Sequence, residues 1–279
     1  MTTRLIRRTG LLALTWAAVA LAGTAGAQVA RRGLPGSQRD SAAQHRATGT
    51  IDGFVGDSTL NPLLSAEVKL LSTNVRVNTG PNGRFRISNV PEGRYVVIVR
   101  RAGYSPTSAV VDVPAADTLR LAYELQRSMT SLAPAVITAA ATSRRNMEFE
   151  QRKNAGFGEF MNEAEINKRN SVYTTELMRR FRTVNVSPSS TNYHGGMPDY
   201  YALSRRETGS LNSAQQNYCP MSVFVDNIAM PTPFNLDLLP SPRNLMGIEV
   251  YNGPSTVPPQ FSGMNRGCGV ILIWTKDGG

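Results

Sequence analysis

The sequence predicts a mostly β protein of the α+β class, in which an N-terminal β-sandwich precedes a smaller α/β region. Two observations carry this prediction. Between residues 47 and 126, short runs rich in β-branched residues alternate with turn formers, a spacing typical of an antiparallel sandwich. From Pro220 to Lys276, three more apolar runs are separated by Pro- and Gly-rich turns, and helical patterns precede them.

Length and composition indicate a folded chain. Its 279 residues suffice for one or two domains, each with a core. Charged residues make up 18% and hydrophobic residues 41%, which favours folding over disorder. A net charge of +10 would suggest nucleic acid in a cytoplasmic protein, but the N-terminus indicates export, so we expect no nucleic-acid partner. In an exported protein we expect the positively charged side chains to face anionic lipid or envelope polymers, or to form a solvated surface.

Residues 1–27 have the three parts of a secretory signal peptide. These are a basic start, an apolar run and a small-residue cleavage site, at Arg4 to Arg8, Leu11 to Leu21 and Ala25 to Ala27. The apolar run is short for a membrane span, so we expect cleavage, with an uncleaved anchor or a twin-arginine signal as alternatives. Residues 28–46 are polar and lack a hydrophobic period, which predicts a disordered tether.

The sandwich, residues 47–126, is expected to contain six or seven strands, six of which can be assigned to particular runs. Turns at Asn82-Gly83 and Pro91 to Gly93 separate them, where Gly supplies a positive φ. The last run alternates apolar and polar residues and therefore suits a half-solvated strand. The predicted strands are Thr50–Val55, Ala66–Leu71, Gly83–Ile87, Arg94–Arg100, Ala109–Val113 and Thr118–Leu125.

A linker is expected over residues 127–154, and the second region over residues 155–279. Asn162 with Glu165 three positions on predicts a helix start of the capping-box type. A second helix, Tyr173 to Phe181, places Leu177, Met178 and Phe181 on one inward face. The predicted strands are Gly156–Met161, Arg182–Val186, Tyr200–Leu203, Met221–Asp226, Gly247–Tyr251 and Gly269–Thr275, the third of them inside a long polar loop.

The chain has two cysteines, Cys219 and Cys268, which open the first and the last of the three C-terminal strands. Because exported proteins keep disulfides, we predict that the two are bonded. The alternative is a pair of buried thiols, and two cysteines are too few ligands for a zinc site.

No pattern in the sequence indicates an enzyme, a metal site or a cofactor. His45 lies in the tether and His194 in a Gly-flanked loop, without an acid at a spacing that would identify a general base. The Gly-rich stretches lack the strand and helix context of a phosphate loop. Basic pairs such as Arg144-Arg145 and Arg179-Arg180 are interpreted as solvated faces, with contact to an anionic surface as the alternative.

The run from Thr79 to Tyr104 (TGPNGRFRISNVPEGRYVVIVRRAGY) resembles the carboxypeptidase regulatory-like domain, over about residues 47–126. The resemblance implies a transthyretin-like sandwich, also described as a carbohydrate-binding-like fold, without peptidase chemistry. An exposed aromatic cluster around Tyr95 and Tyr104 would make it a sugar- or peptide-binding module. In the family, however, both tyrosines are more often buried as core residues.

The C-terminal region resembles the plug domain of TonB-dependent outer-membrane receptors. The resemblance is carried by Val223-Phe-Val-Asp-Asn227, Ile248-Glu-Val-Tyr-Asn-Gly-Pro254 and Gly269-Val-Ile-Leu-Ile-Trp-Thr-Lys276, in the family's order. In the family a large β-barrel follows, and none is expected in these 279 residues, so transport by this chain alone is not predicted. The resemblance implies a location in the periplasm or at the periplasmic face of the outer membrane of a Gram-negative bacterium.

The linker contains Leu132-Ala-Pro-Ala-Val-Ile-Thr-Ala139, which resembles the segment before receptor plugs. In receptors this segment holds the TonB box, which adds as an edge strand to a TonB-type protein. Val136, Ile137 and Thr138 are therefore candidate partner-binding residues, with a plain interdomain linker as the alternative. The strand Val223, Phe224, Val225 and Asp226 is a second candidate.

The function expected from these patterns is that of an exported, non-enzymatic, plug-type interaction protein. Its partner would be a separate β-barrel or a TonB-type protein. The alternatives are a sugar- or peptide-binding module carried by the sandwich, and a truncated TonB-dependent receptor.

Overall fold

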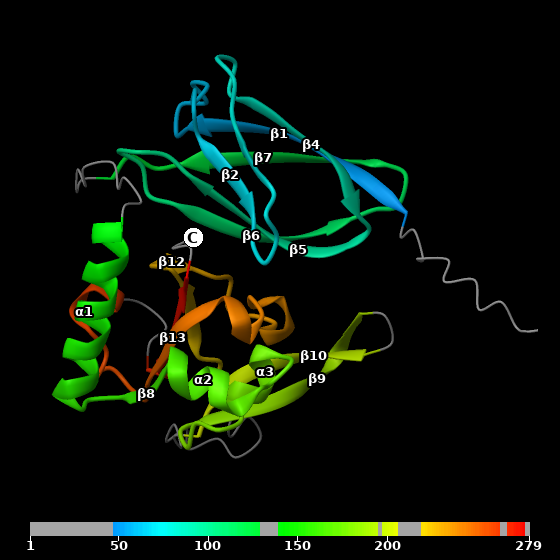
Figure 1. Cartoon of the computed structure of the whole chain (residues 1–279). Coiled ribbons are helices and arrows are strands. Elements are labelled where there is room, and N and C mark those ends of the chain that lie inside the picture. Colours follow the sequence, from blue (N-terminus) through cyan, green and yellow to red (C-terminus); the bar gives the residue numbers. More distant parts are fainter. Residues whose placement is uncertain (1–46, 129–138, 195–196, 206–218, 263–266, 277–279) are drawn as a thin grey trace, which may run out of the picture. The chain divides into compact units, whose positions relative to one another are not determined.

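A computed structural model describes five stretches of the chain, residues 47–128, 139–194, 197–205, 219–262 and 267–276 (Figure 1). The predicted signal peptide and tether, and the candidate segment Val136 to Thr138, lie outside these stretches. None of the helices in the described stretches is both long and apolar enough to span a lipid bilayer.

Residues 47–128 form a β-sandwich of two sheets, with strand orders β4-β1-β7 and β3-β2-β5-β6 (Figure 1). Each of the six predicted strands corresponds to an observed one, and the short β3 was not predicted. The strands are β1 (Thr48–Asp57), β2 (Glu67–Leu70), β3 (Arg76–Asn78), β4 (Arg84–Pro91), β5 (Gly93–Arg100), β6 (Thr107–Val113) and β7 (Thr118–Leu125).

One strand pair departs from the expected antiparallel arrangement. β1 pairs with β4 antiparallel but with β7 parallel, and Ile51 lies opposite Leu119. The half-solvated character predicted for β7 is confirmed, because Leu121 and Tyr123 pack against the sandwich core while Arg120 is exposed.

Strand β5 is buried on both of its faces, and its apolar run explains why. Val97 and Val99 point into the sandwich core, together with Ile51 and Phe85. Val96 and Ile98 point to the opposite face and belong to a second core cluster. A strand buried on both faces needs a continuous apolar run rather than an alternating one, which is what residues 95–99 provide.

The second region contains a five-stranded sheet, a two-stranded hairpin and short helices. The sheet has the strand order β12-β11-β14-β13-β8, and the hairpin pairs β9 with β10. The elements are α1 (Ala139–Ala155), β8 (Glu159–Asn162), α2 (Glu163–Arg169), α3 (Thr174–Met178), β9 (Val184–His194), β10 (Met197–Ser204), β11 (Ser222–Val225), β12 (Ile228–Ala229), η1 (Leu236–Leu238), η2 (Pro242–Asn244), β13 (Leu245–Tyr251), η3 (Pro259–Phe261) and β14 (Val270–Thr275).

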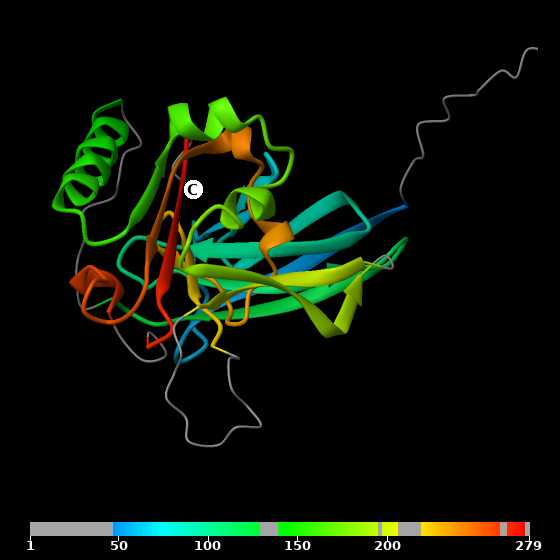
Figure 2. The same cartoon turned by 90° about the horizontal axis from the view of Figure 1, so that it is seen from below.

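The five-stranded sheet buries both of its faces, and alternate residues of each strand serve different cores. Ile248 and Val250 of β13 pack with α2 and α3 residues such as Ile166 and Leu177. Tyr251 belongs to the cluster on the opposite face, with Phe149 of α1. Figure 2 accordingly shows α1 on one side of the sheet and α2 with α3 on the other.

The expected linker over residues 127–154 is wrong for its second half, because α1 covers Ala139–Ala155. This helix is mostly polar, so it shows no broad apolar stripe that would identify it from the sequence. Its side toward the sheet presents Phe149, which is buried, flanked by arginines. Tertiary contacts rather than an amphipathic pattern therefore hold it in place.

The two predicted helices of the second region are present. Asn162 caps α2: its side chain accepts from the Glu165 N–H while the Glu165 carboxylate accepts from the Asn162 N–H, a complete capping box. Helix α3 is shorter than predicted, ending at Met178, yet Leu177, Met178 and Phe181 are all buried as expected. The polar stretch after Val186 was expected as a loop and instead extends β9 into a hairpin with β10.

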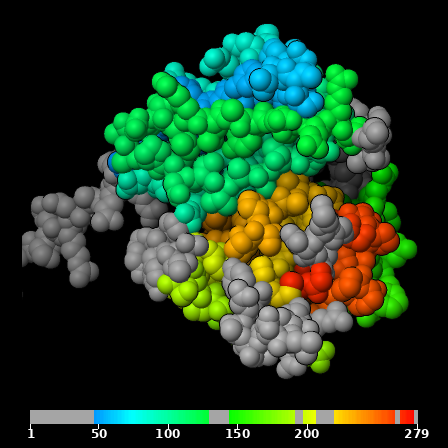
Figure 3. Space-filling model, turned by 180° about the vertical axis from the view of Figure 1, so that it is seen from behind, coloured from blue at the N-terminus to red at the C-terminus, as the bar shows by residue number. Residues whose placement is uncertain are grey.

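Residues 45–279 form one compact unit, and side chains of both regions share a core. Leu71, Val96 and Ile98 of the sandwich belong to the same cluster as residues of the five-stranded sheet. Ser108 of β6 also donates to the carbonyl oxygen of Ala229 at 2.6 Å. Figure 3 shows the two regions in contact, seen from behind: the green and cyan surface of the sandwich meets the orange surface of the second region.

Candidate functional site

The three sequence blocks that resemble a receptor plug lie side by side in one sheet. β14 runs parallel to β11, with Ile271 opposite Val223, and antiparallel to β13, with Ile271 opposite Val250. The polar residues of these blocks are therefore brought close together, although up to 49 residues separate them in sequence.

Glu249 is the centre of a buried polar network on the α1 side of the sheet. Its side chain is 0% exposed, and its carboxylate accepts four hydrogen bonds. The Arg152 guanidinium of α1 donates from Nη2 to Oε1 at 2.7 Å and from Nε to Oε2 at 2.9 Å. The Tyr251 hydroxyl donates to Oε2 and the Trp274 indole Nε1 to Oε1, both at 2.6 Å.

Two members of the network, Tyr251 and Arg152, have raised pKa values and therefore hold their protons more firmly. Burial raises the pKa of the Tyr251 hydroxyl, and its hydrogen bond to Glu249 raises it further. Burial alone would lower the pKa of Arg152, but the hydrogen bond and the charge of Glu249 outweigh it and raise that pKa. Both carboxylate oxygens of Glu249 are engaged by neighbouring donors, so the residue anchors α1 to the sheet.

Asp226 forms a second anchor near the same helix. Asp226 and Asn227 both have positive φ, 48° and 70°, as the central residues of a tight hairpin between β11 and β12 require. The carboxylate accepts from the backbone N–H and the hydroxyl of Thr275, and Arg145 of α1 lies 3.6 Å away.

Helix α1 is thus held through one face. Arg145, Phe149 and Arg152 are spaced by four and then three residues, which places them on one side of a helix. The two arginines are each 17% exposed, so the interpretation of Arg144-Arg145 as a solvated pair is wrong for Arg145. Sequence reasoning missed this anchor, and the spacing was the one signal that could have indicated it.

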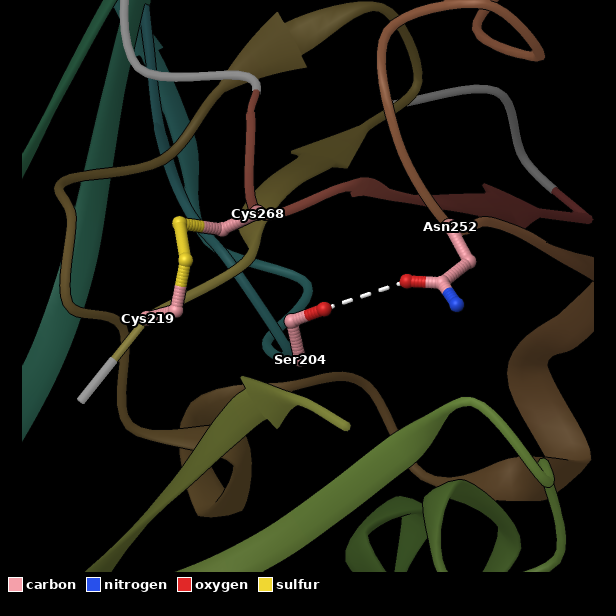
Figure 4. The surroundings of a disulfide bond; sticks show 4 residues. All are labelled: Ser204, Cys219, Asn252 and Cys268. Carbon is pink, nitrogen blue, oxygen red and sulfur yellow. Dashed lines mark hydrogen bonds between the residues drawn. A yellow bond between two sulfur atoms is a disulfide. The ribbon is translucent and has the colours of Figure 1, made fainter. Parts of the chain in front are cut away.

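Cys219 and Cys268 form the predicted disulfide, with a Cα–Cα distance of 5.3 Å (Figure 4). The bond joins the segment before β11 to the segment before β14. Beside it, the Ser204 hydroxyl donates to the Asn252 side-chain oxygen at 3.1 Å, which ties the end of β10 to the end of β13.

The candidate partner strand Val223 to Asp226 does not offer a free edge. Val223, Phe224 and Val225 are buried, and β11 is paired with β14 on one side and β12 on the other. Asp226 is occupied by Thr275 and Arg145. A partner could not add to this strand without displacing β12, so this part of the site prediction does not hold.

Tyr95 and Tyr104 do not form a shared platform. Tyr95 lies at the start of β5 and donates its hydroxyl to the carbonyl oxygen of Pro91 at 2.9 Å. Tyr104 follows the other end of the same strand, with the Arg101 guanidinium 5.3 Å from the centre of its ring. Both are half-buried against the sandwich core, so they act as packing residues.

Among the described residues, no group of three or more His, Cys, Asp or Glu side chains is placed to hold a metal ion. Residues 50–126 match the family described as carboxypeptidase regulatory-like domain. No curated protein matches the sequence.

Several solved structures share a part of the fold. The TIE protein of Bacillus anthracis is 21% identical (TM-score 0.27; 29% of this chain and 17% of that one covered). The minor pilin GBS52 of Streptococcus agalactiae is 19% identical (TM-score 0.26; 32% and 48%). The major pilin subunit BcpA of Bacillus cereus is 23% identical (TM-score 0.26; 29% and 31%). This chain spans less than half of each of these proteins, and likenesses of this size carry no functional argument.

Proposed function

We propose that this chain is an exported, non-enzymatic interaction protein of the envelope of a Gram-negative bacterium. Its C-terminal region acts as a plug-type module of the kind found in TonB-dependent receptors, at the periplasmic face of the outer membrane. Its partner is a separate β-barrel or a TonB-type protein, and the carboxypeptidase regulatory-like sandwich is its companion module.

The observation that carries the proposal is the convergence of the plug-like blocks on the two anchors of helix α1. Glu249, Asp226 and Thr275 come from three separate blocks, and each contributes a buried contact beneath or beside α1. Buried charges are costly unless they are paired, so a sequence retains them where they position something. Here they position α1.

Helix α1 begins directly after the candidate partner segment. Val136, Ile137 and Thr138 immediately precede Ala139, the first residue of α1. Because α1 is anchored at Arg145 and Arg152, the part of the chain that follows this segment in sequence is held in a fixed place. A short apolar segment attached to a rigid base is suited to strand addition onto a partner's sheet edge.

The disulfide agrees with export. Disulfides persist in the periplasm and outside the cell, whereas thiols in the cytosol are kept reduced. Cys219 and Cys268 are bonded, and among the described residues no cysteine is free.

The test is affinity purification of residues 28–279, carrying a C-terminal tag, from detergent-solubilised envelopes of the native host. Mass spectrometry then identifies what is recovered. A β-barrel receptor or a TonB-type protein among the recovered proteins supports the proposal. Recovery of neither, with the tagged chain monomeric in the periplasmic fraction, overturns it.

Two substitutions at one residue locate the contact. Ile137→Pro removes a backbone donor that strand addition requires, whereas Ile137→Val keeps both the donor and the β-branched shape. Recovery of the TonB-type protein should be lost with proline and kept with valine. Equal recovery with both variants would show that this segment is not the point of contact.

A further inference from the structure

The outer face of the sandwich sheet β4-β1-β7 carries a cluster of arginines. Because side chains alternate along strands, residues opposite one another in register share a face. Asp52 of β1 lies opposite Arg86 of β4 and Arg120 of β7. In the next row on this face, Phe54 lies opposite Arg84. Three arginines therefore surround one acid and one aromatic ring.

These side chains line a hollow of about 580 Å³. This volume falls within the range of about 300–1,000 Å³ that is usual for small-ligand sites. Asp52, Phe54, Arg84, Arg86 and Arg120 all contribute to its lining. The three arginines are exposed, so their guanidinium groups are accessible to a ligand in solution.

The charge of the hollow is unbalanced. Asp52 is paired with Arg86, whose Nε lies 2.9 Å from Oδ1 and whose Nη2 lies 3.2 Å from Oδ2. Arg84 and Arg120 have no side-chain ion pair or hydrogen bond within the described part of the chain. The next acid on this face of β7 is Glu124, four residues or about 13 Å further along the strand.

The ring of Phe54 lies close against two glycines. A Cβ at Gly56 would lie 2.8 Å from the ring, and one at Gly83 would lie 2.9 Å from it. Gly83 also has a φ of 71°, so its turn favours glycine in any case. Because both positions lack a side chain, the ring occupies the space above the turn rather than extending freely into solvent.

We propose that this hollow is a binding site for an acidic glycan, a sugar chain that carries carboxylate or phosphate groups. Arg84 and Arg120 would each bind an acidic group, since the guanidinium fork matches the geometry of a carboxylate or phosphate. The Asp52–Arg86 pair presents an acceptor beside donors, which suits neighbouring hydroxyl groups. The half-buried ring of Phe54 offers an apolar surface to the C–H face of a sugar.

This combination favours a glycan over other anions. A membrane surface or an acidic peptide would use the unpaired arginines, but neither presents a sugar ring to Phe54 together with a row of ring hydroxyl groups to the Asp52–Arg86 pair. An acidic glycan uses all the side chains of the hollow. The net charge of +10 adds a general attraction for anions, which falls with rising ionic strength.

The proposal is tested by isothermal titration calorimetry, which measures the binding of oligogalacturonate to residues 28–279 at about 0.15 M salt. The double variant Arg84→Gln/Arg120→Gln should bind at least about tenfold more weakly, since each loses a charge-assisted hydrogen bond. The control Lys168→Gln/Arg169→Gln removes the same charge from exposed positions on α2 and should bind like the unmodified chain.

Several outcomes would overturn the proposal. One is the absence of oligogalacturonate binding by the unmodified chain. Another is an equal loss in both double variants, which would assign the binding to net charge alone. A third is equal or tighter binding of polyglutamate or of phosphatidylglycerol vesicles, which would assign the face to a different partner. Dextran serves as the neutral glycan and should not bind measurably.

Discussion

Arg152 of α1 and Glu249 of β13 lie 97 residues apart in sequence and form a two-contact ion pair inside the protein. The guanidinium also lies over the ring of Trp274, with its carbon atom 5.3 Å from the ring centre. Trp274 donates in turn to the same carboxylate. The pair therefore joins the helix to two neighbouring strands, β13 and β14.

Replacing Arg152 by alanine should destabilise the fold by about 3 kcal/mol, because it leaves the buried Glu249 carboxylate without its counter-charge. Chemical denaturation followed by circular dichroism measures the change in the free energy of unfolding. The matched control is Arg182→Ala: Arg182 is 90% exposed and lies 3.9 Å from Glu159. Such an exposed pair contributes at most about 1 kcal/mol, so equal losses in the two variants would contradict the anchoring role of Arg152.

The parts of the fold that the sequence predicts are those that depend on local pattern. The alternation of Phe85 and Ile87, bounded by the turn at Gly83, marks β4 without knowledge of its partners. The capping box of Asn162 and Glu165 marks the start of α2 in the same way. In both cases, the residues that define the element lie within a few positions of one another.

Helix α1 and the site at Glu249 depend on contacts that no local pattern contains. The helix has a single buried apolar residue, Phe149, among its described side chains, so its sequence is compatible with a solvated linker. Glu249 lies in an apolar strand, where alternation alone predicts neither burial nor a partner. The partner, Arg152, becomes evident when the sheet places β13 beneath α1.

Loss of the disulfide should destabilise the chain by about 4 kcal/mol, the chain-entropy value for a loop of about 50 residues. Cys219 and Cys268 are 49 positions apart. The double variant Cys219→Ser/Cys268→Ser should therefore melt at a lower temperature than the oxidised chain. A reducing agent should lower the melting temperature of the unmodified chain to that of the variant, while leaving the variant unchanged. No effect of either change would mean that the crosslink does not constrain the unfolded chain.

Tyr123→Phe should raise stability, or leave it unchanged, below pH 10. The Tyr123 hydroxyl is buried and has no hydrogen-bond partner in the described structure. Its removal eliminates an uncompensated buried polar group and should raise the free energy of unfolding by up to about 1 kcal/mol. The hydroxyl of Thr183, in the second region, is likewise buried without a hydrogen-bond partner, so Thr183→Val is a matched second test. A loss of more than about 1 kcal/mol in Tyr123→Phe would indicate an unrecognised partner.

Burial also raises the pKa of Tyr123 to about 12. The unfolded chain then loses this proton at a lower pH than the folded chain. Deprotonation of Tyr123 therefore favours the unfolded chain: it costs no stability below the unfolded pKa of about 10, and stability is lost as the pH rises from there toward 12. Denaturation curves between pH 9 and pH 12 should show a steeper decline for the unmodified chain than for Tyr123→Phe, and parallel curves would contradict the assignment.

Arg94→Ala should weaken the contact between the sandwich and the second region. The Arg94 guanidinium of β5 lies 3.1 Å from the Asp199 carboxylate of β10 and 2.9 Å from that of Asp112. Asp199 is buried and also accepts from Asn235 at 2.8 Å, so the variant leaves a buried carboxylate with fewer donors. We expect one calorimetric unfolding transition for the unmodified chain and a broadened or divided transition for the variant, because less coupling energy then joins the two regions.

The matched control for this experiment is Arg76→Ala, which removes a salt bridge to Glu67 inside the sandwich and none to the second region. It should lower the melting temperature slightly and keep one transition. If Arg94→Ala also unfolds in one sharp transition, then the apolar contacts of Leu71, Val96 and Ile98 suffice to couple the regions. In that case, substitution of Ile98 by Ala should separate the transitions, since it removes buried apolar surface that both regions share.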